Sequence, residues 1–388
     1  MKFLLATLLT VMLVALGGCK RASAPPPQNA NSQTAEAEQL NPPAGGTTPV
    51  AEVKYFRGSI GSSLGLQMKL TREGDKLWGS YFYQKVGTKI DLKGSIDTNG
   101  YVTLEEFDPQ GKQTGIFKGL WQQNQDDGLI AIAGNWTKPN GDKKTAFSLH
   151  QEPIEFSGGV EIASKSIKEN NKKLKYEIDA DYPQVTGATD GRYDKFNQEA
   201  KNVAAAEVAN FRKEMAEWAA EQAEIQTDEE PASGNSGLQV GYTISLANDS
   251  LISTQFNIGT YFQGAAHPNS HTRVVNYDLK AGKPIKLADL FNPGSKYLQT
   301  ISSYSIKELK KQSSKGGESM FDDEWVQKGA GPSADNYKSW VITKKGLGIN
   351  FDAYQVAPYA AGPQHVLIPY SVLKDIIKPD GPLAPFLK

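Results

Sequence analysis

The strongest constraint on the fold is a series of short alternating segments that fills residues 51–155. Apolar and polar residues alternate within a segment, as in a strand with one buried face, and Leu66, Met68 and Leu70 share such a face. Turn residues divide the segments at intervals of about 8–12 residues. This pattern predicts an all-β domain over 51–155, either a meander barrel or a sandwich. The turn signals are Glu73-Gly74, Thr98-Asn99-Gly100, Asp108-Pro109-Gln110-Gly111 and Pro139-Asn140-Gly141.

The remainder of the folded chain, residues 165–388, mixes helical and strand patterns. Phe196 and Phe211 belong to an apolar stripe at helical spacing, which predicts a long helix over 193–224. We therefore expect an α+β module with a mostly antiparallel sheet. Its other expected elements are a strand at 174–181, a hairpin over 238–262, a helix at 294–312, strands near 339–351 and 364–369 and a last helix from about Ser371, in a first part, 165–236, and a second part, 237–388.

The N-terminus predicts export and a lipid anchor. Residues 3–16 form an apolar run that has the length of a signal-peptide core and is too short for a typical membrane span. The run ends in Leu16-Gly17-Gly18-Cys19, which resembles the lipobox of bacterial lipoproteins. The resemblance implies a signal peptide over 1–18, cleavage before Cys19 and lipid on its sulfur. The alternative is an ordinary signal peptide with a chance cysteine.

A tether is expected between the anchor and the folded part. Residues 19–50 are rich in Pro, Ala, Gln and Asn and almost free of large apolar side chains, which is typical of disordered segments. Lys20 stands where an Asp would favour retention at the inner membrane. We therefore expect a lipid-anchored protein of the cell envelope, on the outer membrane facing the periplasm if the organism is Gram-negative.

Composition excludes two classes of explanation. The net charge of −1 and the isoelectric point near 6.5 argue against a nucleic-acid partner, which requires a basic surface. Cys19 is the single cysteine, so no internal disulfide can form and the domains must be held by their cores.

Two of the four histidines, His267 and His271, lie four positions apart in the stretch YFQGAAHPNSHT and raise the question of a metal site. Pro268 prevents the helix that would place both rings on one face. In an extended chain, four residues span about 13 Å, too far for one ion. Because no Cys, Asp or Glu nearby completes a ligand set, the sequence predicts no metal and no cofactor here.

The sequence shows no signature of a hydrolase in the required context. The pattern G-x-S-x-G occurs at Gly61-Ser62-Ser63-Leu64-Gly65, but it lies between alternating strand segments and not before a helix, so it is no nucleophile elbow, and the chain has no H-E-x-x-H and no candidate catalytic cysteine. A site in which His267 or His365 meets a carboxylate distant in sequence stays open as an alternative, namely an envelope hydrolase.

Two separated motifs resemble the C-terminal extracellular module of RsiV-type anti-sigma factors and PdaC-type peptidoglycan deacetylases. The resemblance spans about 165–388, and it includes YEIDADYPQV and Phe196-Asn197 upstream. The first motif has Ala265 where the family has Gly. The matching positions are Gly264, Ala266, His267, Pro268, Asn276, Tyr277, Asp278, Gly282, Lys283, Leu287, Leu290 and Phe291, and then Phe351, Tyr354, Ala357, Tyr359, Gly362, Ile368, Pro369 and Tyr370.

The resemblance implies a module outside the membrane that recognises cell-wall-related partners. In the anti-sigma factors it is a lysozyme receptor, and in the deacetylases it accompanies a separate catalytic domain. No segment of the sequence matches that catalytic domain, and no anti-sigma cytoplasmic segment precedes the lipobox.

These observations favour a lipid-anchored, non-enzymatic binding protein for a lysozyme-like hydrolase or a peptidoglycan fragment. An acidic run over 214–230 is a candidate complement to a basic lysozyme. A scaffold lipoprotein, whose β-domain binds another envelope protein, is a further alternative. The candidate binding residues are Tyr261, Gln263, His267, Asn269, His271, Tyr354 and Tyr359.

Overall fold

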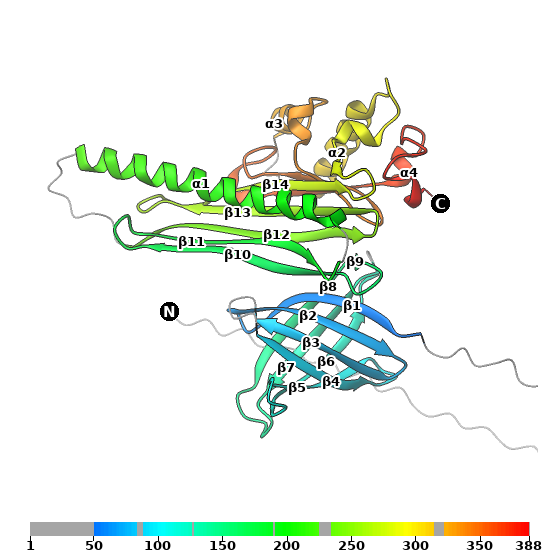
Figure 1. Cartoon of the computed structure of the whole chain (residues 1–388). Coiled ribbons are helices and arrows are strands. Elements are labelled where there is room, and N and C mark those ends of the chain that lie inside the picture. The colour runs from blue at the N-terminus through cyan, green and yellow to red at the C-terminus, as the bar shows by residue number, and fades with distance from the viewer. Residues whose placement is uncertain are drawn as a thin grey trace, which may run out of the picture. The chain divides into compact units, whose positions relative to one another are not determined.

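The computed structural model describes residues 50–83, 88–125, 128–188, 191–224, 234–313 and 322–387 (Figure 1). Pro49–Lys388 form one compact unit, separate from Met1–Thr48. The expected signal peptide, Cys19, nearly all of the tether and the end of the acidic run lie outside the described residues. Among the described residues, no helix has the length and apolar character required to cross a membrane.

Eight strands form a closed antiparallel barrel in which each strand pairs with the next and β8 returns to β1. The predicted all-β domain is thus confirmed, and it is a meander barrel rather than a sandwich. The strands are β1 (Glu52–Ile60), β2 (Leu64–Glu73), β3 (Lys76–Tyr83), β4 (Lys89–Ile96), β5 (Tyr101–Phe107), β6 (Gln113–Gln123), β7 (Ile130–Thr137) and β8 (Thr145–Glu152).

The barrel interior is filled by side chains from alternate positions of its strands. Leu66, Met68 and Leu70 are at most 2% exposed, as their shared face predicted. The rings of Phe117 and Phe147 meet edge to face, with their centroids 5.0 Å apart. Closure leaves no unpaired strand edge, which stabilises an all-β domain that has no disulfide.

A seven-stranded sheet forms the first layer of the module. Neighbouring strands pair antiparallel, except that β12 pairs in parallel with both β11 and β9. The strands are β9 (Ile154–Glu155), β10 (Glu161–Asn171), β11 (Tyr176–Thr186), β12 (Ser236–Asn248), β13 (Leu251–Tyr261), β14 (Asn269–Asp278) and β15 (Lys283–Pro284).

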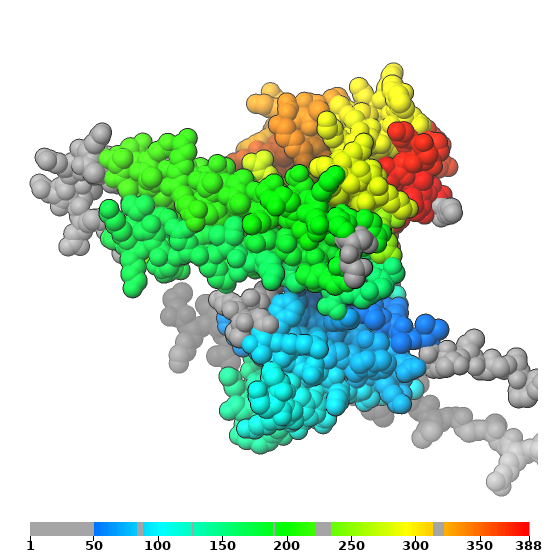
Figure 2. Space-filling view, viewed as in Figure 1, coloured from blue at the N-terminus to red at the C-terminus, as the bar shows by residue number. Residues whose placement is uncertain are grey.

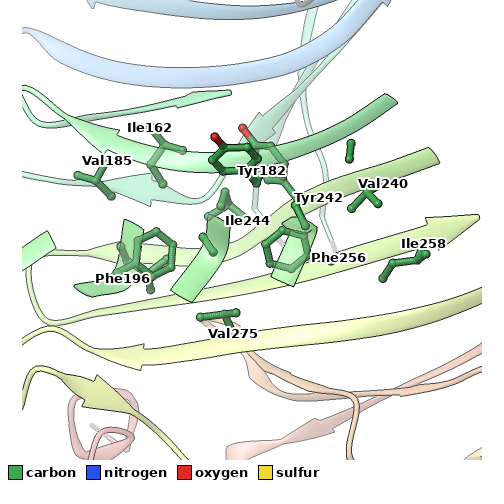
Figure 3. Packing of buried hydrophobic residues seen from close by; sticks show 14 of the residues in the cluster. Ile162, Tyr182, Val185, Phe196, Val240, Tyr242, Ile244, Phe256, Ile258 and Val275 are labelled. Atoms are coloured by element: carbon green, nitrogen blue, oxygen red, sulfur yellow. The ribbon is translucent and has the colours of Figure 1, made fainter. Parts of the chain in front are cut away.

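The long helix α1 (Asp194–Glu224) lies along this sheet (Figure 1). Its stripe packs Phe196, Phe211 and Met215 into the core, each at most 1% exposed. Figure 3 shows Phe196 among apolar side chains of the sheet, including Ile244 and Val275. The predicted helix over 193–224 is confirmed, although Tyr193 belongs to a preceding 3-10 turn.

A second core lies between the remaining helices and a three-stranded sheet ordered β16–β17–β18. Figure 2 shows this part, coloured yellow to red, as a lobe beside α1. The elements are α2 (Tyr297–Ser313), α3 (Asp323–Gly329), β16 (Trp340–Ile342), β17 (Gly346–Phe351), β18 (Gln364–Pro369) and α4 (Tyr370–Leu373), with 3-10 turns η1 (Gly191–Tyr193), η2 (Leu287–Leu290), η3 (Ala334–Tyr337), η4 (Tyr359–Ala361) and η5 (Ala384–Phe386).

A buried hydrogen-bonded node joins the two sheets. Ser253 donates to Asn276 Oδ1 at 2.6 Å and accepts a bond from the main-chain N–H of Ile342 at 2.8 Å. Asn276 Nδ2 donates to the carbonyl of Trp340 at 2.8 Å. Ser253 is 0% and Asn276 3% exposed, so water does not replace these bonds. The node fixes β16 against β13 and β14.

Replacing Asn276 by Leu should destabilise the chain, because the buried Trp340 carbonyl and Ser253 hydroxyl would lose their partners. We expect a loss of about 1–3 kcal/mol in the free energy of unfolding, measured by denaturant titration. The control is Asn257→Leu: Asn257 accepts a bond from Gln255 at 2.7 Å but is exposed, so water can replace it. Equal stability of the two variants would contradict the role of the node.

Replacing Gly94 by Ala should destabilise the barrel. A Cβ at Gly94 would lie 1.9 Å from the carbonyl oxygen of Thr103, so β4 and β5 would have to separate. Overpacking of this kind costs about 1–3 kcal/mol. At Gly241 of β12 a Cβ would meet nothing within 4 Å. In thermal unfolding, Gly94→Ala should lower the Tm and Gly241→Ala should leave it nearly unchanged; the reverse order would refute the explanation.

Candidate functional site

Four aromatic side chains from three separate segments gather on the surface of the module, and we call His267, Trp325, Tyr354 and Tyr359 the aromatic cluster. The imidazole of His267 stacks on Tyr359, with ring centroids 4.0 Å apart and planes inclined by 24°. Tyr354 lies 5.5 Å from Tyr359. His267 comes from the loop between β13 and β14, the two tyrosines follow β17, and Trp325 lies on α3.

Hydrogen bonds to one carbonyl hold the two loops together. Tyr359 donates its hydroxyl to Pro268 O at 2.7 Å, and His267 Nδ1 lies 2.9 Å from the same oxygen. Because a carbonyl oxygen only accepts and has two lone pairs, Nδ1 carries the hydrogen and both bonds can form. Gly264 provides the turn with a φ of 86°. These contacts tie the turn that carries His267 to the loop that carries Tyr359.

Tyr354 has an unusual backbone and an exposed ring. Its φ is 69°, in the left-handed region that few residues other than glycine adopt. Half of its surface, 50%, is exposed. Trp325 Nε1 donates to the Tyr354 carbonyl at 2.9 Å, which fixes this conformation against α3.

A cleft of about 480 Å³ opens beside Tyr354 and Trp325. Gln355 closes one wall, where its amide nitrogen donates to the carbonyls of Gly329 and Asn336, each at 3.0 Å. The cleft therefore combines aromatic faces with polar groups, as small-molecule sites do. The other lining residues are Asp322, Glu324 and Lys328.

The structure brings only some of the candidate residues together. His267, Tyr354 and Tyr359 belong to the aromatic cluster. Gln263 is 8% exposed, and its main-chain N–H donates to Ser236 at 2.9 Å, so its position is structural. Tyr261 ends β13 and Asn269 begins β14, both outside the cluster.

His271 lies within β14 and not in the loop. Its Nε2 is 3.4 Å from Glu207 of α1, and Arg273 contacts the same carboxylate at 3.1 Å. Glu207 is 8% exposed, so these contacts tie the sheet to the helix. Among the described residues, no group of three or more His, Cys, Asp or Glu side chains is arranged to hold a metal ion.

His365 belongs to a chain of amide contacts. Asn350 donates through Nδ2 to Gln255 at 2.6 Å, so its Oδ1 accepts from His365 Nδ1, also at 2.6 Å. Partial burial lowers the pKa of His365, and the nearby Asp352 carboxylate opposes that shift. The hydrogen bonds of His267 and His365 in the described structure thus go to a carbonyl and an amide, not to the carboxylate that a hydrolytic pair would need.

Sequence reasoning missed Trp325 and Gln355. Trp325 lies in a short segment flanked by Gly- and Ser-rich chain, where no periodic pattern supports a helix. Its large aromatic side chain beside the Asp322 cap, which accepts a bond from the Trp325 N–H at 2.9 Å, is the signal that could have identified it.

Comparisons with known proteins find similarities over the C-terminal region of the chain, which carries the aromatic cluster. A family model described as Deacetylase PdaC matches residues 167–270, and one described as a protein of unknown function, DUF3298, matches 288–371. The chain is 28% identical over 250 residues to the peptidoglycan-N-acetylmuramic acid deacetylase PdaC of Bacillus subtilis, covering 64% of this chain and 48% of that protein. It is 26% identical over 114 residues to the immunogenic protein MPT64 of Mycobacterium tuberculosis, and this match covers 29% of this chain and 47% of that protein.

Two crystal structures of DUF3298 family proteins are also similar. The one from Bacteroides fragilis has a TM-score of 0.44 and 20% identity, covering 60% of this chain and 98% of that one. The one from Pseudomonas aeruginosa has a TM-score of 0.41 and 16% identity, and it covers 57% of this chain and 94% of that one. The chain spans about half the length of the curated relatives it matches. The C-terminal region of this chain is a PdaC-type module that includes a DUF3298 domain.

Proposed function

We propose that this chain is a lipid-anchored binding protein of the cell envelope whose module recognises a cell-wall glycan without catalysing a reaction. The similarity to a peptidoglycan deacetylase supports an association with the cell wall. The observation that carries the binding role is the exposed aromatic cluster, and Tyr354 in particular.

The backbone of Tyr354 argues for a function of its ring. The left-handed conformation costs a residue with a side chain about 1–2 kcal/mol, and glycine or asparagine would avoid much of that cost. Strained residues of this kind gather at binding sites. A ligand stacked on the exposed ring of Tyr354 accounts for a tyrosine in this position.

The surroundings of the ring suit a sugar. A sugar ring has faces of C–H groups and an edge of hydroxyls, so it pairs with an aromatic face and with polar groups beside it. Tyr354 and Trp325 supply the aromatic faces, and Asn336, Lys328 and Glu324 supply polar groups within the same cleft. The contacts of Tyr359 and Trp325 with neighbouring carbonyls keep the rings ordered, which reduces the entropy lost on binding.

A lysozyme-like hydrolase is a second candidate partner. Asp322 and Glu324 line the cleft, and Glu214 and Glu221 are exposed on α1. Carboxylates on these surfaces would attract a basic protein and speed its encounter. Lys328 in the same cleft offsets part of that charge.

The contacts of His267 and His365 support a binding role rather than a hydrolytic one. His267 is engaged with Pro268 and Tyr359, and His365 with Asn350. The similarity to a deacetylase makes acetate release the reaction to assay. Release of acetate from peptidoglycan by the purified chain would replace this proposal with an enzymatic one.

Replacing Tyr354 by Asn should weaken glycan binding, because Asn accepts the left-handed backbone but lacks the ring. For residues 49–388 titrated calorimetrically with soluble peptidoglycan fragments, we expect a Kd at least about tenfold higher, or about 1.4 kcal/mol. The control is Tyr101→Asn, which removes a ring that is 62% exposed on the barrel. It should leave the Kd unchanged.

Three outcomes distinguish the partners. Glycan binding that depends on Tyr354 supports the proposal. Binding of hen lysozyme alone, lost in 0.5 M salt, would favour the hydrolase partner. No interaction with either at micromolar concentration would refute both, and circular dichroism of the variants would show that folding is not the cause.

Replacing Cys19 by Ser should release the chain from membranes, because the thiol would be the only attachment point for lipid. Membrane and soluble fractions of the native host, probed with an antibody, should show the native chain in the membrane fraction. Retention of the serine variant there, with its signal peptide removed, would contradict the lipid anchor.

A further inference from the structure

The seven-stranded sheet ends in a long strand with an open side. β10 is its outermost strand (Figure 1), and among the described strands β11 alone pairs with it. In an antiparallel pair, alternate residues direct their main-chain N–H and C=O groups away from the partner strand. The outer side of β10 therefore presents a row of main-chain donors and acceptors to which another extended segment can bind.

The described polar contacts between the barrel and this edge lie at its start. Tyr55 of β1 donates its hydroxyl to the carbonyl of Val160 at 3.3 Å, and Lys69 of β2 contacts Glu161. Further along the strand, four of the six side chains over 165–170 are exposed. No residue of β10 lines the cleft beside the aromatic cluster. The edge is therefore a second surface, independent of the proposed glycan site.

Lysines dominate β10 and the turn that follows it, and we call residues 161–175 the basic edge. This segment carries five lysines against two glutamates, in a chain whose net charge is −1. Each glutamate is matched by a basic side chain from another element: Glu161 contacts Lys69, and Glu169 accepts a bond from Arg212 of α1 at 2.8 Å. The five lysines, all exposed, are Lys165, Lys168, Lys172, Lys173 and Lys175.

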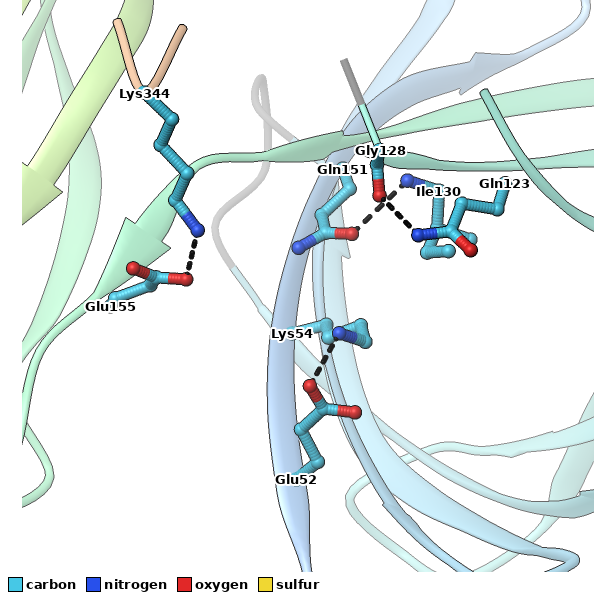
Figure 4. Close-up of polar contacts among 8 residues, drawn as sticks. All are labelled: Glu52, Lys54, Gln123, Gly128, Ile130, Gln151, Glu155 and Lys344. Atoms are coloured by element: carbon cyan, nitrogen blue, oxygen red, sulfur yellow. Dashed lines mark hydrogen bonds and ion pairs between the residues drawn. The ribbon is translucent and has the colours of Figure 1, made fainter. Parts of the chain in front are cut away.

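Most of these lysines have no carboxylate of their own. Lys168 pairs with Asp179 of β11 at 3.2 Å, and among the described residues the other four form no ion pair. Glu177 of β11 lies opposite the end of β10 and offsets one further charge. Figure 4 shows the contrasting case of Lys344, which contacts the carboxylate of Glu155. The basic edge thus keeps an excess of positive charge that an anionic partner can neutralise.

We propose that the basic edge binds an acidic segment of another protein, which adds to β10 as an extended strand. Main-chain bonds to the outer side of β10 supply the affinity. Lys165 and Lys168 are three positions apart and point to opposite faces, so they match acidic side chains on both faces of the segment. Lysines on an edge strand also discourage pairing with neutral or basic strands, so the same charges select the partner.

The probe is a decapeptide of glutamate, threonine and valine with blocked ends. It is titrated calorimetrically into residues 49–388, one compact unit that contains all three hydrophobic cores. We expect saturable binding that weakens at least tenfold when lysine replaces glutamate in the peptide, when its main-chain nitrogens are methylated, or when the salt is raised to 0.5 M. Equal affinity for the methylated peptide, or for inorganic polyphosphate, would show that charge alone is recognised and overturns the proposal.

A pair of charge-reversed variants locates the site. Lys165→Glu combined with Lys173→Glu breaks no ion pair of the described structure. It should weaken binding of the acidic peptide at least tenfold and strengthen binding of the lysine peptide. Lys138→Glu combined with Lys144→Glu, at exposed positions of the barrel, makes the same change in net charge and should alter neither. Native affinity in the first variant overturns the assignment to β10.

The acidic run of this chain is the competing occupant. Asp228, Glu229 and Glu230 follow α1 in the sequence, and their carboxylates would also suit the lysines. Peptide binding that is seen only after all three are replaced by their amides would mean that the chain neutralises its own edge, and it would overturn the proposal of an outside partner. Binding that the three replacements leave unchanged supports that proposal.

Hydrogen exchange on the unaltered unit separates strand addition from charge attraction. The acidic peptide should slow the exchange of main-chain amides within 164–171, because those on the outer side acquire acceptors. It should leave unchanged the amides of β18, which is also the edge strand of a sheet. Saturating peptide without added protection in β10 contradicts strand addition, and this measurement does not depend on the folding of any variant.

Discussion

The arrangement of the module depends on the buried node between Ser253 and Asn276. These side chains bond each other and also bond main-chain groups of β16, so all of their partners lie in a core without water. Buried polar groups are costly unless each is satisfied, which makes the position of β16 specific. The loops of the aromatic cluster extend from these elements and their neighbour: His267 precedes β14, and Tyr354 follows β17, which pairs with β16. The geometry of the surface site therefore rests on the core beneath it.

The cluster itself is built from contacts that are remote in sequence. The bond from Tyr359 to Pro268 spans 91 positions, and it places the Tyr359 ring against His267. Aromatic side chains have few rotatable bonds, so they lose little conformational entropy when a ligand covers them. With the ring of Tyr354 beside them, they present a surface that is ordered before binding.

Turn residues in the sequence were sufficient to predict the turns between the strands of the barrel. Gly74, Gly100, Gly111 and Gly141 in the predicted turns all have positive φ values, as their turns require. Closure of the barrel was not predictable, because β1 meets β8 through partners as distant as Tyr55 and Glu152, for which no local pattern exists. Its position near Pro268 in the sequence groups His271 with the loop, whereas the residue pairs with Ile258 within a strand and its Nε2 contacts Glu207 on a separate helix. Such tertiary partners decide which candidate residues share a site.

Specific contacts fix the barrel to the module. Arg57 is held between Glu152 and the Tyr242 ring, and Gln67 also reaches the Tyr242 hydroxyl at 3.4 Å. Burial disfavours the charge of Arg57, and its contacts with Tyr242 and Glu152 raise its pKa in spite of that burial. Burying a charge in this way is weak as a source of stability but effective in selecting one orientation. The barrel therefore keeps one orientation on the module, set by contacts that a flexible connection would not provide.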